Sequence, residues 1–131
     1  MDTSRGQTIA DPASGLFTLR GVQTREALAR FAGDEERYRH WLTEFITHGP
    51  AAARQIREAI TNGSVETATL LAHAFKGRTG MLGMAELHSI AQSLEMTLRN
   101  REPTALWLEE LEQTVAEMSQ QISDVLGERS A

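Results

Sequence analysis

Cysteine is absent from the 131-residue sequence, and aromatic residues make up only 5% of it. The first absence excludes disulfides and thiolate metal sites, and it is typical of a protein kept in a reducing compartment. No apolar run approaches the roughly 20 residues that span a membrane, and the first fifteen residues have no apolar centre like that of a secretory signal. We therefore expect a cytoplasmic chain without direct membrane insertion, either free-standing or as the cytoplasmic part of a larger protein.

The sequence also has no excess of basic residues. The chain has 13 Lys and Arg against 18 Asp and Glu, which gives a net charge of -5. Proteins that bind the phosphate backbone of nucleic acids normally carry the opposite balance, so we expect no nucleic-acid partner. The length suits a single domain that buries its own core.

Helical periodicity, in contrast, is present in almost every segment after Leu16. Because no stretch of β-branched residues alternates with polar ones, we predict an all-α fold. Capping and stop signals divide the chain. They predict helices over about 24–32, from about 35 to the "HGP" at 48–50, from Pro50 to about 60, over about 65–82 and 84–100, and after about 104.

Loops this short between long amphipathic helices force neighbouring helices to pack antiparallel. We predict an antiparallel up-down four-helix bundle over residues 16–127, with one or two short extra helices at its N-terminal end. Residues 1–15, which mix Gly, Ser, Pro and Asp, are expected to form a flexible leader or the remnant of a linker. Residues 128–131 are expected to fray. We expect a monomer.

The stretch "LLAHAFKGRTGMLG" at 70–83 contains two glycines inside a predicted helix, where each costs roughly 1 kcal/mol relative to Ala. At about 100° per residue, Gly77 lies about 40° from His73 and Gly80 about 20° away on the other side. Phe75 lies close to the opposite face. His73 is therefore predicted to point outward, along a strip of the helix with few side chains, where another backbone can approach closely.

An exposed imidazole of this kind suits a general base, a metal ligand or a nucleophile. A general base normally needs an orienting carboxylate, and no acid lies three or four residues from His73. A metal site in a bundle favours the Glu-x-x-His spacing, but position 70 is Leu, so we expect no metal site. A nucleophile that accepts a phosphoryl group fits best, with Lys76 one turn further on to support the anionic oxygens.

The stretch "AHAFKGRTGMLGMAEL" with the later "LE" resembles the signature of histidine-containing phosphotransfer (HPt) domains of bacterial phosphorelays. The family's His-x-Leu-Lys-Gly core, followed by a Gly, corresponds here to His73, Phe75, Lys76, Gly77 and Gly83. "RFAGDEERYRHWLTEF" and "LHSIAQSLEMTLR" are similar to the flanking family segments, so the resemblance covers about 16–99. The chain departs from the family where "RT", at 78–79, replaces small residues, a difference that bears on partner choice.

The resemblance implies a four-helix bundle that acts in two-component signal transduction without catalytic activity of its own. His73 would accept a phosphoryl group from an aspartate of a receiver domain and pass it to the aspartate of another receiver. Lys76 would give electrostatic support and Gly77 would allow close docking. Mg²⁺ and the acidic pocket would belong to the receiver, so we expect no cofactor on this chain. The donor receiver could be part of a hybrid sensor histidine kinase, with this chain as its cytoplasmic C-terminal module.

Position alone adds Thr69, Leu70 and Gly80 to the predicted docking surface around His73. Glu95 is expected to pair with a basic residue on a facing helix rather than to take a direct part in transfer. The remaining histidines are expected to be ordinary surface or core residues, and the larger aromatic side chains to lie in the core or at its rim; the two sets are His40, His48 and His88, and Trp41, Phe45, Phe75 and Trp107. Two alternatives stay open: a non-transferring helical adaptor that binds and regulates a receiver or kinase domain, and a metal- or cofactor-carrying bundle enzyme.

Overall fold

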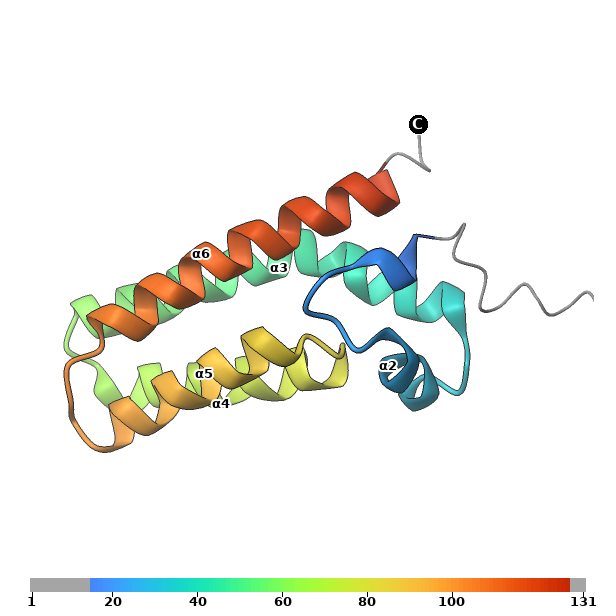
Figure 1. Ribbon diagram of the computed structural model, residues 1–131. Helices are drawn as coiled ribbons and strands as arrows, with labels where there is room; N and C mark the ends of the chain where they lie inside the picture. Colours follow the sequence, from blue (N-terminus) through green and yellow to red (C-terminus); the bar gives the residue numbers. More distant parts are fainter. Residues whose placement is uncertain (1–14, 128–131) are drawn as a thin grey trace, which may run out of the picture.

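The computed structural model describes residues 15–127 and confirms the all-α prediction (Figure 1). Its elements follow in the order η2 (Leu16–Thr18), α2 (Thr24–Arg30), α3 (Glu35–Thr61), α4 (Val65–Met81), α5 (Ala85–Arg99), α6 (Ala105–Ile122) and η3 (Ser123–Gly127). The four long helices form the antiparallel bundle, with α3 and α6 in one layer and α4 and α5 in the other. The predicted leader and tail lie outside the described residues, except for Gly15.

The predicted break at "HGP" is wrong, because α3 runs unbroken through Pro50. A proline inside a helix costs about 3 kcal/mol, since it removes one backbone hydrogen bond and crowds the preceding turn. Burial continues on both sides of it, from Tyr38 to Ala59, which offsets this cost. Gly49 does not end the helix. It leaves room for the Phe45 ring, since a Cβ at this position would lie 2.6 Å from Cζ of that ring.

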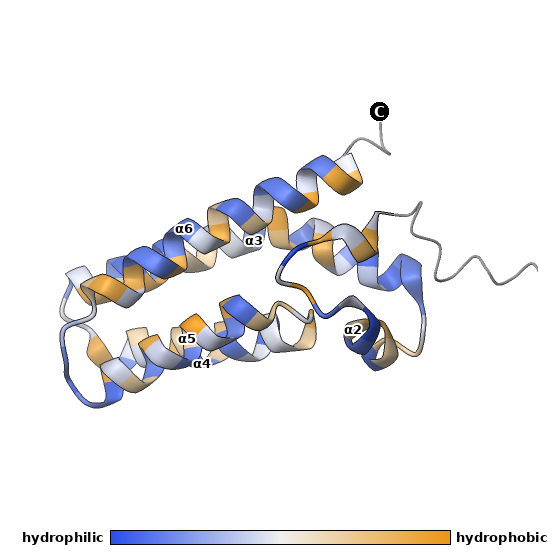
Figure 2. Ribbon diagram, viewed as in Figure 1, coloured by the Kyte–Doolittle hydropathy of each residue, from blue (hydrophilic) through white to orange (hydrophobic). Residues whose placement is uncertain are grey.

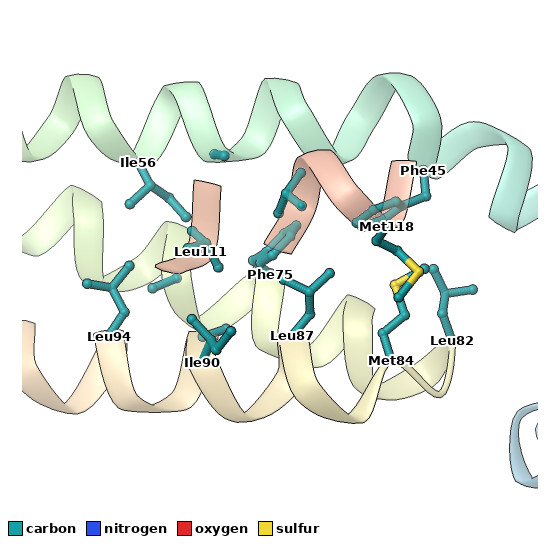
Figure 3. Close-up of a cluster of buried hydrophobic side chains, with 14 of the residues drawn as sticks. Phe45, Ile56, Phe75, Leu82, Met84, Leu87, Ile90, Leu94, Leu111 and Met118 are labelled. Carbon is teal, nitrogen blue, oxygen red and sulfur yellow. The ribbon is translucent and has the colours of Figure 1, made fainter. Parts of the chain in front are cut away.

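One apolar face of each long helix supplies the core (Figure 2). Phe45 and Phe75 stack across the α3–α4 interface with their ring centroids 6.1 Å apart. Leucines and other aliphatic side chains of α5 and α6 close around them (Figure 3). The face that α5 turns to the core includes Leu87, Ile90, Ala91, Leu94 and Leu98.

The segment before α3 packs across one end of the bundle, against the turn that joins α4 and α5. The backbone of Gln23 donates to the carbonyl of Gly83 over 2.7 Å, and Ala85 donates to Gly21 over 3.1 Å. Gly83 follows the C-cap residue of α4 and adopts a φ of +80°, the left-handed conformation in which a glycine commonly ends a helix. Arg30 of α2 donates to the carbonyls of Gly80 and Met81, so a side chain from α2 stabilises the C-terminal end of α4.

Within residues 15–127, no helix is both long enough and apolar enough to cross a membrane.

Candidate functional site

His73 lies in the middle of α4, and its side chain is 59% exposed. Phe75 of the same helix is buried in the core, so α4 turns its apolar face inward and the imidazole outward, as the helical periodicity predicts. The hydrophobic stripe and the core packing thus determine the direction of the ring. His73 is therefore reachable by a partner without any movement of the bundle.

A carboxylate from the next helix orients this ring. Nδ1 of His73 lies 2.9 Å from Oε2 of Glu95, a residue of α5 that is only 4% exposed. An ionised carboxylate can only accept, so Nδ1 is the donor and carries the hydrogen. In the neutral imidazole the lone pair then resides on Nε2, the nitrogen free to act as a nucleophile.

Two cations, Lys76 and Arg99, also contact Glu95. Nζ of Lys76 lies 2.8 Å from Oε1, and the guanidinium of Arg99 donates to Oε2 over 2.7 Å from its terminal nitrogen and 3.2 Å from Nε. Burial alone would raise the pKa of Glu95, but the hydrogen bonds from Lys76, Arg99 and His73 outweigh it and lower the pKa to about 2. Glu95 is therefore ionised at neutral pH.

The cluster of His73, Lys76, Glu95 and Arg99 carries a surplus positive charge. Lys76 and Arg99 contribute two positive charges and Glu95 one negative, so the cluster has a net charge of about +1 while the imidazole is neutral. An incoming dianionic phosphoryl group would meet an attractive rather than a repulsive site. Arg99, which the sequence did not predict, thus adds a second cation beside Lys76, whose support of a phosphoryl group stays a prediction.

The ion pair of Glu95 with Lys76 agrees with the expectation of a basic partner on a facing helix. The contact of Glu95 with His73 was missed, because only spacing within α4 was searched for an orienting acid. The available signal was the position of Glu95 in "SLEMTLR", one turn before Arg99 on a helix expected to neighbour α4. Spacing along one helix could not reveal a carboxylate supplied by the next.

The two glycines beside His73 have different surroundings. Among the residues that the structure describes, none would lie within 4 Å of a Cβ at Gly77, so the space beside this residue is open. A Cβ at Gly80 would lie 2.9 Å from Nδ1 of His88, whose ring occupies that space and donates to the carbonyl of Lys76 over 2.9 Å. Gly80 thus makes room for a side chain of this chain, and the expectation that it clears a docking surface is corrected.

The other predicted docking residues also differ from one another. Leu70 is 69% exposed, a large apolar side chain in water one turn before His73. Thr69 is only 8% exposed, and its hydroxyl donates to the carbonyl of Val65 within α4. Thr69 therefore offers little surface to a partner, because most of its side chain is buried and its hydroxyl is hydrogen-bonded within α4.

An apolar groove of about 420 Å³ opens beside Gly77, between α3 and α4. Its walls include Phe31, Trp41, Phe45 and Met81, and Arg78 lies at its edge. Trp41 is 43% exposed, so the expectation that it belongs to the core or its rim is corrected: the ring forms part of the groove. The groove continues the open space beside Gly77 toward α3, whereas Glu95 contacts His73 from α5.

Among the described residues, 15–127, no group of three or more His, Asp or Glu side chains is arranged to hold a metal ion. His88 makes the backbone hydrogen bond described above, and His48 lies 3.5 Å from Glu44 on the surface of α3. Neither histidine has the setting of His73, in which a buried carboxylate and two cations surround an exposed ring.

The family model of the Hpt domain matches residues 40–125, and the chain belongs to this family. Its members are helical phosphotransfer modules of two-component phosphorelays that interact with receiver domains. The match covers all four long helices apart from the first residues of α3, and it includes His73 and Glu95. Comparison with curated proteins and with solved structures gave no significant match.

Proposed function

We propose that this protein is a phosphorelay intermediate in which Nε2 of His73 accepts a phosphoryl group from the aspartate of one receiver domain and passes it to that of another. The observation that carries the proposal is the His73–Glu95 hydrogen bond, which directs the lone pair of an exposed imidazole outward. The surplus positive charge of Lys76 and Arg99 supports the same role. Membership of the Hpt family makes receiver domains the expected partners.

In this proposal the chain has no autonomous catalytic activity. It contributes a positioned nucleophile, while the receiver encloses the phosphoryl group and supplies Mg²⁺ and its own acidic pocket. The open notch at Gly77 and the adjoining groove let the receiver approach His73 closely. Apolar receiver side chains would pack against Trp41 and Met81, with exposed Leu70 at the other end of the same surface.

The direct test is phosphoryl transfer from a phosphorylated cognate receiver. We expect an acid-labile label on the wild-type protein and none on His73→Gln, since an amide cannot form the N–P bond. His88→Gln is the matched control, because its ring comes from α5 and is hydrogen-bonded to the backbone carbonyl of Lys76. A label that persists in His73→Gln would refute the proposal. Receiver binding without any label, unchanged in His73→Gln, would favour the non-transferring adaptor.

A further inference from the structure

The C-terminal end of α5 carries an arginine where a glycine is favoured. The helix is closed by a Schellman motif, in which the backbone of Glu102 donates to the carbonyl of Thr97 over 3.0 Å. The residue before Glu102 must then take a left-handed backbone conformation, and α4 places Gly83 in the equivalent position. In α5 this residue is Arg101, with a φ of +55°. Because a Cβ is unfavourable in this conformation, the helix end is less stable than it would be with glycine.

The contact that the Arg101 side chain makes within the chain does not offset this cost. Its guanidinium lies 3.8 Å from the carboxylate of Glu66, and the two side chains are 64% and 91% exposed. Solvent screens so open an ion pair, and pairs of this kind contribute little to stability. Since backbone strain tends to occur at functional sites, the arginine is better explained by a contact with another molecule.

Arg101 lines a surface pocket of about 370 Å³ between the start of α4 and the end of α5. Leu70 and Leu98 form an apolar part of its wall, and the side chains of Arg99 and Arg101 form a basic part. The lining also includes Glu66, so it carries two positive charges and one negative charge. A carboxylate side chain next to an apolar one therefore complements this pocket in charge and in polarity.

This pocket and the apolar groove lie on opposite sides of His73 along α4. The α4 residues that line the groove fall within 74–81, whereas those that line the pocket fall within 65–70. Arg99 links the pocket to the phosphoryl site, because it also donates to Glu95, the residue that contacts His73. A protein domain that covers His73 with an interface of ordinary size would therefore reach both the groove and the pocket.

We propose that the pocket at Arg101 selects among receiver domains, by binding an Asp or Glu side chain that the preferred receivers carry beside an apolar one. This inference rests on the proposed function and adds to it a means of telling one receiver from another. Arg101 is a specificity-determining residue that touches neither the phosphoryl group nor His73. Because the contact lies at the solvent-exposed rim, it acts mainly on the rate of association and on the choice of partner.

The test compares stability with receiver-dependent transfer and binding. Arg101→Gly removes the side chain and relieves the backbone, so the two properties should change in opposite directions. We expect the midpoint of thermal unfolding to rise by about 3 °C. Transfer from a preferred phosphorylated receiver, at limiting concentration and low salt, should fall about fivefold, and the loss should shrink as salt is added. Phosphoramidate, a small donor that needs no receiver, should label His73 at the wild-type rate.

Further variants separate charge from backbone conformation. Arg101→Lys keeps both the charge and the left-handed residue, so it should retain most of the transfer. Arg101→Glu should lose more than Arg101→Gly, and exchanging the matching acidic residue of the receiver for Arg should restore transfer. Ala32→Gly is the matched control for strain, because Ala32 ends α2 in the same kind of motif with a φ of +56°. It should raise stability without changing transfer, and Arg54→Gln, which removes an exposed charge on α3, should also leave transfer unchanged.

Wild-type transfer and binding in Arg101→Gly with every receiver would overturn the inference. A loss that is the same at low and high salt, or as large in Arg101→Lys, would also overturn it, and so would a midpoint of unfolding that does not rise in Arg101→Gly. A receiver that binds without labelling His73 would refute the proposed function instead, and the affinities of the Arg101 variants would still decide the role of the pocket. If no receiver bound the wild-type protein, both proposals would fail.

Discussion

Gly77 and Gly80 lie one turn apart on the same exposed side of α4, yet their surroundings differ. At Gly80 the missing side chain is replaced by the His88 ring from α5, which hydrogen-bonds to the α4 backbone. At Gly77 the space remains open and continues into the groove lined by Trp41 and Met81. A missing side chain thus serves internal packing in one case and leaves accessible surface in the other.

Because of this difference, the surface around His73 is covered on its α5 side and open on its α3 side. Toward α5 the ring is enclosed by Glu95 and its cations, with His88 filling the notch one turn further on. At Gly77, no side chain of residues 15–127 comes within 4 Å of the position that a Cβ would take. A partner that reaches Nε2 should therefore come over Gly77 and the groove, while the hydrogen bond from Glu95 on the α5 side holds the orientation of the ring.

The largest effect is expected from Gly77→Leu, which would fill the open notch. A bulky side chain beside His73 should hold a receiver away and lower the rate of receiver-dependent transfer about a hundredfold, since small misplacements of reacting groups have effects of this size. Stability should not fall, because Leu has a higher helix propensity than Gly and a Cβ there meets nothing within 4 Å. Transfer kinetics measure the expected loss of rate, and thermal unfolding followed by circular dichroism measures the stability. Unimpaired transfer would show that the open notch is not the route of approach.

A smaller effect is expected from Trp41→Ala, which would remove one wall of the groove. Exposed aromatic side chains that a partner buries commonly contribute 1–2 kcal/mol to binding, so transfer at limiting receiver concentration should fall about tenfold. The loss should disappear at saturating receiver, because Trp41 lines the groove and takes no part in the hydrogen bonds and ion pairs of the His73 cluster. Phosphoramidate labelling should stay at the wild-type rate. A matched substitution on α6, Leu106→Ala, also removes an exposed apolar side chain but lies outside the groove, so it should leave transfer unchanged.

The smallest effect is the difference in stability between Gly77→Ala and Gly80→Ala. The first should stabilise α4 by up to about 1 kcal/mol through helix propensity alone. The second must displace the His88 ring, so it should be less stable than Gly77→Ala by about 1 kcal/mol. Thermal unfolding measures both, and adding His88→Ala to each should remove most of the difference. Equal stabilities of the two single variants would mean that His88 moves aside without cost.

The central part of this site could be predicted from the sequence because it lies on one helix. The outward direction of His73 and the positions of Lys76 and Gly77 relative to it follow from a period of 3.6 residues. The bundle followed from the amphipathic stripes and the short loops. These features depend on local spacing, which the chain itself defines.

The features that were missed depend on contacts between helices. The contact of Glu95 with His73 depends on how α5 is shifted along α4, and the filled notch at Gly80 depends on where His88 lands. Pro50 was expected to begin a helix because its local signal is strong, but buried residues on both sides of it favour continuation. Trp41 was assigned to the core or its rim because one helical stripe does not show how far a neighbouring helix covers it.

The hydrogen bonds that join the N-terminal segment to the α4–α5 turn matter for anyone who clones a fragment of this protein. The family match begins at residue 40, but Gln23 and Arg30, which bond to that turn and to the end of α4, come before it. That turn sets the alignment of α4 against α5, and hence the meeting of His73 with Glu95. A fragment cut at the family boundary would keep His73, Lys76, Glu95 and Arg99 and lose the hydrogen bonds that support their alignment.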